Sequence, residues 1–171
     1  MTLRPAFWLV AAGVVVADQA TKQWALVALE RSERVPVIGD LLSFTLRFND
    51  GAAFSFGAGR TWILTIVALA LTVGIAWYAR RANGRIPALI FAVGLGGAVG
   101  NLIDRLFREP SFGQGHVVDM IAYGDFFVGN VADIAIVGAA AWGVLYTMTR
   151  GSLLTPEPAP EGASEEPSES A

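Results

Sequence analysis

The chain has 171 residues, a formal net charge of −3 and a hydrophobic content of 54%. It has no cysteine and one histidine, His116, which excludes disulfides, thiol nucleophiles and cysteine-based metal sites and argues against a zinc site. Four apolar stretches are each long enough to cross a hydrocarbon layer of about 30 Å. We therefore predict an integral membrane protein, mainly α-helical, with a four-helix bundle whose spans cover about residues 6–28, 62–79, 86–106 and 126–148.

The first predicted span contains the polar run "ADQATKQW". Asp18 and Lys22 are four residues apart in it, so they share one face of a helix and can form an ion pair. This pair either positions the helix or contacts substrate or catalytic groups. Because the charges interrupt the apolar stretch and no A-x-A site follows Ala28, we expect the span to be retained rather than cleaved as a signal peptide.

Residues 29–61 are too long and too patterned for a simple linker. In "LLSFTLRF", apolar and polar residues alternate from Leu42 to Phe48, which indicates a half-buried strand in a small sheet at the membrane surface. The apolar face of this strand either packs on the helices or holds a lipid-borne substrate. The next run, "FNDGAAFS", includes Asn49 and Gly51; it is typical of a hairpin turn, or of open backbone that an extended peptide can pair with.

The connection "ARRANGR" between the second and third spans contains Arg80, Arg81 and Arg85. Positive charge in a short loop marks the cytoplasmic side, so both termini are predicted to be cytoplasmic, with residues 29–61 and 107–125 outside. Residues 1–150 form the predicted membrane domain. Residues 151–171 are rich in Pro, Glu, Ser and Ala and are predicted to be a disordered acidic cytoplasmic tail.

The third predicted span contains "GLGGAVGNLIDRLF". Gly96 and Gly100 form a small-xxx-small pair, which lets a neighbouring helix approach closely. Asn101 and Arg105 follow near the outer end of the span, where each serves either the structure or substrate binding. Asp104 is expected to neutralise Arg105.

Two aspartates flank the start of the fourth predicted span. Asp119 lies in the β-like run "HVVDMIAY", and Asp133 is expected about two turns inside the helix, with Asn130 one turn earlier to orient it. A chain reversal between them can bring the carboxyls together, and close carboxyls share one proton. Such a pair can activate water and protonate a carbonyl. Spacing alone leaves a catalytic pair, a proton or ion relay and a structural hydrogen-bonded pair open.

Five motifs, "DQATK", "FNDGAAFS", "GNLIDR", "VVDM" and "NVADIAI", occur in this order among the four spans. Together they resemble the lipoprotein signal peptidases, or signal peptidase II. The resemblance implies an intramembrane aspartyl endopeptidase that removes signal peptides from diacylglyceryl-modified bacterial prolipoproteins, cutting on the amino side of the lipid-bearing cysteine. It implies a small extracytoplasmic β-cradle and a short outer helix on the four-helix bundle.

The resemblance also implies roles for individual residues. Asp119 and Asp133 match the catalytic aspartates. Met120 and Gly129 depart from the family, which commonly has Phe at both positions, but they are neighbours of the matching residues. The residues that match positions lining or supporting the substrate site are Asp18, Lys22, Asn49, Gly51, Asn101, Arg105 and Asn130.

We therefore expect a monomer in the bacterial cell membrane, with its active site at the outer leaflet. Its expected partners are lipid-modified prolipoproteins and membrane lipids, without a metal, cofactor or nucleic acid. The rival interpretations are a small ion- or proton-coupled transporter or relay subunit, in which Asp18, Asp104 and Asp133 pass protons, and a non-catalytic assembly factor.

Overall fold

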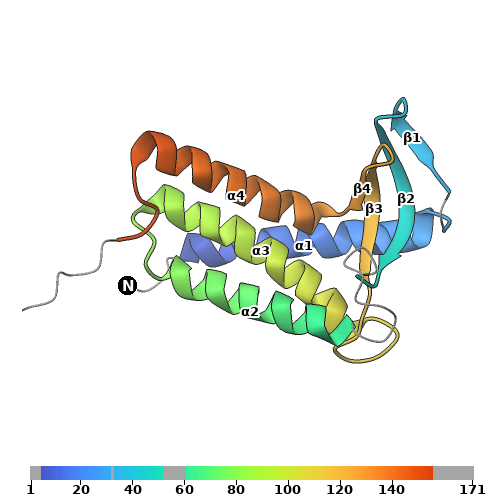
Figure 1. Cartoon of the computed structure of the whole chain (residues 1–171), viewed down its shortest axis with the longest axis horizontal. Coiled ribbons are helices and arrows are strands. Elements are labelled where there is room, and N and C mark those ends of the chain that lie inside the picture. The colour runs from blue at the N-terminus through green and yellow to red at the C-terminus, as the bar shows by residue number, and fades with distance from the viewer. Residues whose placement is uncertain (1–4, 32, 52–60, 156–171) are drawn as a thin grey trace, which may run out of the picture.

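The computed structural model describes residues 5–31, 33–51 and 61–155. These residues form the helices α1 (Pro5–Ala28), α2 (Thr61–Ala79), α3 (Arg85–Phe107) and α4 (Val131–Arg150). They also form the strands β1 (Val35–Ile38), β2 (Leu42–Asn49), β3 (Val117–Tyr123) and β4 (Phe127–Gly129). The helices lie side by side, and the sheet stands across one end of the bundle (Figure 1).

The first three helices match the predicted spans to within one residue at each end. The fourth does not: α4 begins at Val131 rather than near residue 126, because residues 127–129 form β4. Within the described chain, α2, α3 and α4 are long and apolar enough to cross a membrane, and α1 is not among them. The fold is therefore mostly helical, with three helices of membrane-spanning length and composition.

Helix α3 lies at the centre of the bundle and packs against α1, α2 and α4. Its glycines make this possible. A Cβ on Gly96 would lie 2.6 Å from a backbone carbonyl of α1, and one on Gly97 would lie 2.6 Å from a backbone carbonyl of α4. A Cβ on Gly100 would lie 2.5 Å from the carboxylate of Asp18. The predicted close approach at Gly96 and Gly100 is confirmed.

The sheet is antiparallel, in the order β1-β2-β3-β4. Strand β2 covers the alternating run that predicted a strand, and β3 covers the run that contains Asp119. In the pairing of these two strands, Arg47 lies opposite Asp119 and Asn49 lies opposite Val117. The β2–β3 pair thus brings the turn after β2 beside the carboxyl of Asp119.

The alternation in β2 does not sort apolar from polar side chains as expected. Ser43 and Thr45 are buried, whereas Leu42 and Phe44 are only half-buried. A register irregularity also lies between Phe44 and Arg47, so one alternation cannot hold along the whole strand, because an extra residue in one strand reverses the faces beyond it. Beyond this irregularity, the buried side chain of Leu46 packs with Ala25 of α1 and with Val118 and Met120 of β3.

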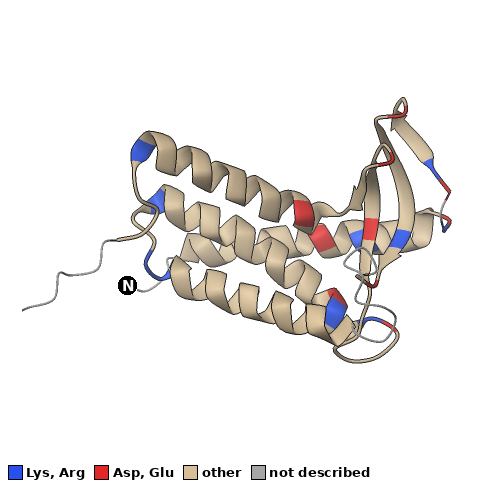
Figure 2. Cartoon of the chain, viewed as in Figure 1, with Lys and Arg blue, Asp and Glu red and all other residues tan. Residues whose placement is uncertain are grey.

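Charged residues lie at the two ends of the bundle, and the middles of the helices are almost free of them (Figure 2). The end away from the sheet carries basic residues, including those of the α2–α3 loop. The end at the sheet carries both signs. Among the residues that the structure describes, no outer helix accompanies α1–α4; residues 52–60, with the second half of "FNDGAAFS", and residues 156–171, with most of the predicted tail, lie outside them.

Candidate active site

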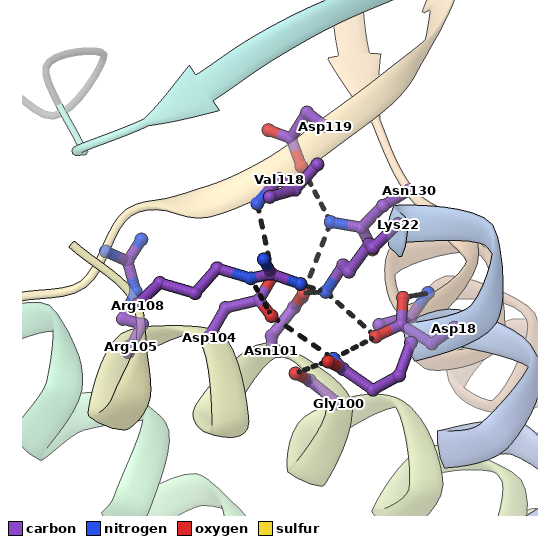
Figure 3. A network of polar contacts seen from close by, with 12 residues as sticks. Asp18, Lys22, Gly100, Asn101, Asp104, Arg105, Arg108, Val118, Asp119 and Asn130 are labelled. Carbon is purple, nitrogen blue, oxygen red and sulfur yellow. Dashed lines mark hydrogen bonds and ion pairs between the residues drawn. The ribbon is translucent and has the colours of Figure 1, made fainter. Parts of the chain in front are cut away.

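Polar side chains from three helices and the sheet meet where the bundle reaches β3 (Figure 3). Helix α1 contributes Asp18 and Lys22, α3 contributes Asn101 and Asp104, and β3 contributes Asp119. The structure therefore brings together residues that lie about a hundred positions apart in the chain. The remaining two members, Asn130 and Asp133, form the start of α4.

The start of α4 is a reciprocal capping box. The side-chain oxygen of Asn130 accepts a hydrogen bond from the backbone N–H of Asp133 at 3.0 Å, and the backbone N–H of Asn130 donates to Asp133 Oδ2 at 3.1 Å. Such a box satisfies amides that have no partner within the helix. It confirms that Asn130 orients Asp133. It also places Asp133 in the first turn of α4, so the expected position two turns inside was wrong.

Asp119 is the buried carboxyl of the sheet, with only 3% of its surface exposed. Its Oδ1 accepts a hydrogen bond from Asn130 Nδ2 at 2.6 Å, and its Oδ2 accepts one from Asn49 Nδ2 at 3.0 Å. Burial, with a further contribution from the negative charge of Asp133, raises the pKa of Asp119 to about 7. Asn130 therefore contacts both carboxyls, one with its side chain and one with its backbone.

Lys22 is the centre of the buried network below these carboxyls. Its Nζ lies 2.8 Å from Asp18 Oδ2 and 2.9 Å from Asp104 Oδ2, and it donates to Asn101 Oδ1 at 2.9 Å. All three donors of the ammonium group thus have partners, as burial of a charge requires. The predicted Asp18–Lys22 pair is confirmed.

Asn101 links this network to Asp133. Its Oδ1 accepts from Lys22 and, at 3.2 Å, from Asn130 Nδ2. Its Nδ2 then donates to Asp133 Oδ1 at 2.8 Å. Because both donors fix the oxygen of Asn101, its amide nitrogen must face Asp133.

Asp104 forms its ion pairs with residues other than Arg105, the neighbour that it was expected to neutralise. It is fully buried and pairs with Lys22 and with Arg108, whose Nε lies at 2.7 Å, and it accepts from the backbone N–H of Val118 at 3.1 Å. Arg105 is also buried, but its Nη1 donates to the backbone carbonyl of Gly115 at 3.5 Å. The two neighbours on α3 therefore serve different parts of the site.

The turn after β2 orients Asn49. Its side-chain oxygen accepts from the backbone N–H of Gly51 at 2.9 Å, which leaves its Nδ2 for Asp119. Gly51 has a φ of 89°, a conformation that favours glycine, and a Cβ there would collide with the side chain of Leu64. Gly51 therefore supports the site through the backbone.

Two residues of the network were missed in the sequence. Gln19 Nε2 donates to Asp18 Oδ2 and to Asp104 Oδ1, which ties α1 to α3, and Arg108 pairs with Asp104. A glutamine inside an apolar stretch was a signal that could have been used, because polar groups at membrane depth are costly. Asp18 also accepts from the backbone N–H of Ala132 at 2.9 Å, so it contacts the first turn of α4.

The described residues contain no group of three or more His, Asp or Glu side chains arranged to hold a metal ion. What they contain is a pair of carboxyls, bridged by one asparagine, at the end of a bundle of apolar helices. This fold and site define a helical membrane protein with an acidic dyad.

Comparison with known proteins identifies the family. The model of the Signal peptidase (SPase) II family matches residues 10–149. Lipoprotein signal peptidases from Mycobacterium avium and Leifsonia xyli are 47% and 41% identical, over 77% and 82% of this chain. The matched segments span 72% and 65% of those proteins, and 56% of a 47% identical relative from Mycolicibacterium smegmatis. The chain belongs to the signal peptidase II family and is a peptidase.

The fold has a counterpart among solved structures. A bacterial membrane enzyme determined by the in meso method superposes with a TM-score of 0.73 and 23% identity, over 86% of this chain and 94% of that one. At that identity the likeness concerns the fold alone.

Proposed function

We propose that this chain is an aspartyl endopeptidase that removes signal peptides from diacylglyceryl-modified prolipoproteins, cutting on the amino side of the lipid-bearing cysteine. The observation that carries the proposal is the pair Asp119 and Asp133, held by Asn130 at the end of the bundle. The relatives named lipoprotein signal peptidase support the choice of substrate.

The dyad can share one proton in the resting enzyme. We assign this proton to Asp119, because its burial near Asp133 raises its pKa to about 7. Each oxygen of Asp133 accepts one N–H bond, from Asn101 and from the backbone of Asn130. The two carboxyls thus share Asn130 as a partner and differ in their second donor, which is Asn49 for Asp119 and Asn101 for Asp133.

In the proposed reaction, Asp133 takes a proton from a water molecule, and the water oxygen attacks the scissile carbonyl carbon. Asp119 donates its proton to the carbonyl oxygen, which gives a neutral tetrahedral diol and avoids a free oxyanion. Asp133 then delivers its proton to the amide nitrogen as the C–N bond breaks. Asp119 recovers a proton from the diol hydroxyl as the new carboxyl forms.

Around the dyad, we assign Asn49, Asn101 and Asn130 to positioning the carboxyls, and Arg105 to the substrate backbone or the surrounding loop. The contact of Arg105 with the carbonyl of Gly115 supports the loop as one of its partners. Asp18 and Lys22 act on the dyad indirectly. Lys22 donates to Asn101, and Asp18 accepts from the first turn of α4.

In the membrane, we propose that α1 crosses together with α2, α3 and α4. At about 1.5 Å per residue, its 24 residues are long enough, and its buried charges face partners in α3. The basic α2–α3 loop and both ends of the described chain lie at the end of the bundle away from the sheet (Figure 1). We place that end in the cytoplasm, and the sheet and dyad at the outer leaflet, with the protein acting as a monomer.

The test is cleavage of a lipid-modified prolipoprotein by the purified parent and by Asp119→Asn and Asp133→Asn. Each single variant should lose at least about a thousandfold in turnover while it still inserts and melts cooperatively, and the double variant should be little worse, because groups that act as one unit are non-additive. Substantial cleavage by either single variant would contradict the two-carboxylate mechanism.

A further inference from the structure

A groove opens beside the dyad, between the sheet and the outward face of α4. Its volume is about 570 Å³, and one end of it reaches Asp133. From there it follows α4 away from the sheet. The residues that form its walls are Tyr123 and Phe127 on the sheet side and Asp133, Ile134, Val137 and Gly138 on α4.

The sheet wall of this groove depends on the absence of a side chain at position 129. Phe127 lies opposite Tyr123 across the β3–β4 pair, and the two rings stack at 6.2 Å with an interplanar angle of 19°. Phe127 and Gly129 are two residues apart in β4, so they share a face. A Cβ on Gly129 would lie 2.5 Å from the ring of Phe127 and 2.8 Å from Asp133 Oδ2. The ring of Phe127 therefore occupies the space next to the dyad that a residue at 129 would fill.

The lining of the groove is almost entirely apolar, and Asn130 and Asp133 are its two polar residues. Phe127, Ile134 and Val137 expose 51%, 50% and 67% of their surfaces. Gly138 leaves open space one turn further along α4. Because α4 has the length and composition of a membrane span, this apolar part leads from the site of cleavage towards the hydrocarbon.

The groove is open along one side, so its volume limits what it can enclose rather than what can lie over it. A helix with its side chains is about 10–12 Å wide and rises about 5.4 Å per turn, so one turn fills roughly 400–600 Å³. The groove would therefore take only about one turn of a signal helix, whereas a single hydrocarbon chain is thin enough to lie along it. In the proposed substrate, the lipid is attached to the residue next to the scissile bond, so an acyl chain must start beside the dyad.

We propose that this groove binds one acyl chain of the diacylglyceryl group and that Phe127, placed by Gly129, is a specificity-determining residue for lipid-modified substrates. This inference rests on the proposed function. The stacked rings of Tyr123 and Phe127 form one wall of the acyl chain's path, and Ile134 and Val137 of α4 form the other.

The experiment compares two synthetic substrates with one peptide sequence, one carrying a dipalmitoyl and one a dibutyryl glyceryl group. The parent should show a higher kcat/KM for the dipalmitoyl substrate. Phe127→Ala should lower that value about tenfold, because it removes most of an apolar wall, and should barely change cleavage of the dibutyryl substrate. The matched control is Phe126→Ala, since Phe126 is 98% exposed and does not line the groove.

A second variant tests the opposite wall. Val137→Trp should obstruct the groove and reduce dipalmitoyl cleavage selectively, whereas Val144→Trp, on an exposed part of α4 outside the groove, should not. Equal effects of the groove variants on both lipids would overturn the inference. A further dipalmitoyl substrate, which differs only in the peptide residue before the scissile bond, adds a check: the inference would also be overturned if Phe127→Ala altered the preference between the two peptides instead of the preference between acyl lengths. Failure of the parent to cleave either lipidated substrate would instead contradict the proposed function.

Discussion

Asp119 is a buried carboxyl whose protonation should make the stability of this protein depend on pH. Its pKa is raised from an ordinary 3.8 to about 7, first by burial and then by the charge of Asp133. Between these two pH values the folded protein keeps a proton that the unfolded chain has lost. Stability should therefore fall as pH rises from about 4 to about 7, and this contribution should be constant above that range.

This pH dependence can be measured as melting temperature in detergent. Asp119→Asn should remove the decline. Asp133→Asn should shorten it, because the loss of the neighbouring charge lowers the pKa of Asp119. A decline in Asp119→Asn that parallels the parent's would show that another group is responsible. Cleavage by the parent should likewise weaken as pH rises through about 7, where Asp119 loses the proton that we propose it donates.

At the scale of elements, Lys22 joins α1 to α3 and, through Asn101, to α4. Lys22→Met should destabilise the protein by about 3–5 kcal/mol, because it leaves Asp18 and Asp104 buried without their shared cation. Adding Asp18→Asn and Asp104→Asn should restore much of the melting temperature. Cleavage should stay low in the triple variant, because Asn101 loses the donor that fixes its amide. If the triple variant recovered full cleavage together with its stability, the network around Lys22 would have only a structural role.

The contact between α1 and α3 depends on Gly96. Gly96→Ala should lower stability by about 1–3 kcal/mol, because the new Cβ would meet backbone, which cannot move aside as a side chain can. Gly13→Ala is the matched control, since a Cβ there has nothing within 4 Å. The measurement is the melting temperature of each variant. If Gly96→Ala left the melting temperature unchanged, α1 and α3 could move apart at no cost in stability.

At the scale of the molecule, the topology can be tested directly because the chain has no cysteine of its own. Phe126→Cys lies in the turn between β3 and β4, and Asn83→Cys lies in the α2–α3 loop at the other end of the bundle; both positions are exposed. In right-side-out vesicles, a membrane-impermeant maleimide should label Phe126→Cys alone. In inside-out vesicles it should label Asn83→Cys alone. The reversed pattern would invert the proposed orientation.

The candidate site was predictable as a set of residues but only in part as a set of bonds. Asp119, Asp133 and their three asparagines were all named from motifs, and all lie together. The partners of Asp104 were not foreseen, since Lys22 and Arg108 approach it from another helix and from the next turn of its own. Adjacency in sequence to Arg105 was a poor guide, because neighbouring residues on a helix point in different directions.

The sequence by itself determined the features that depend on local periodicity. These are the extents of the first three helices, the strand from Leu42, the Asp18–Lys22 ion pair and the face of small residues around Gly96 on α3. Tertiary structure decided where α4 begins and where β2 is irregular. The run from Phe126 to Val137 is apolar enough for either strand or helix, so its division depends on pairing with β3 and on the capping box at Asn130. Such contacts join distant parts of the chain, and no local pattern contains them.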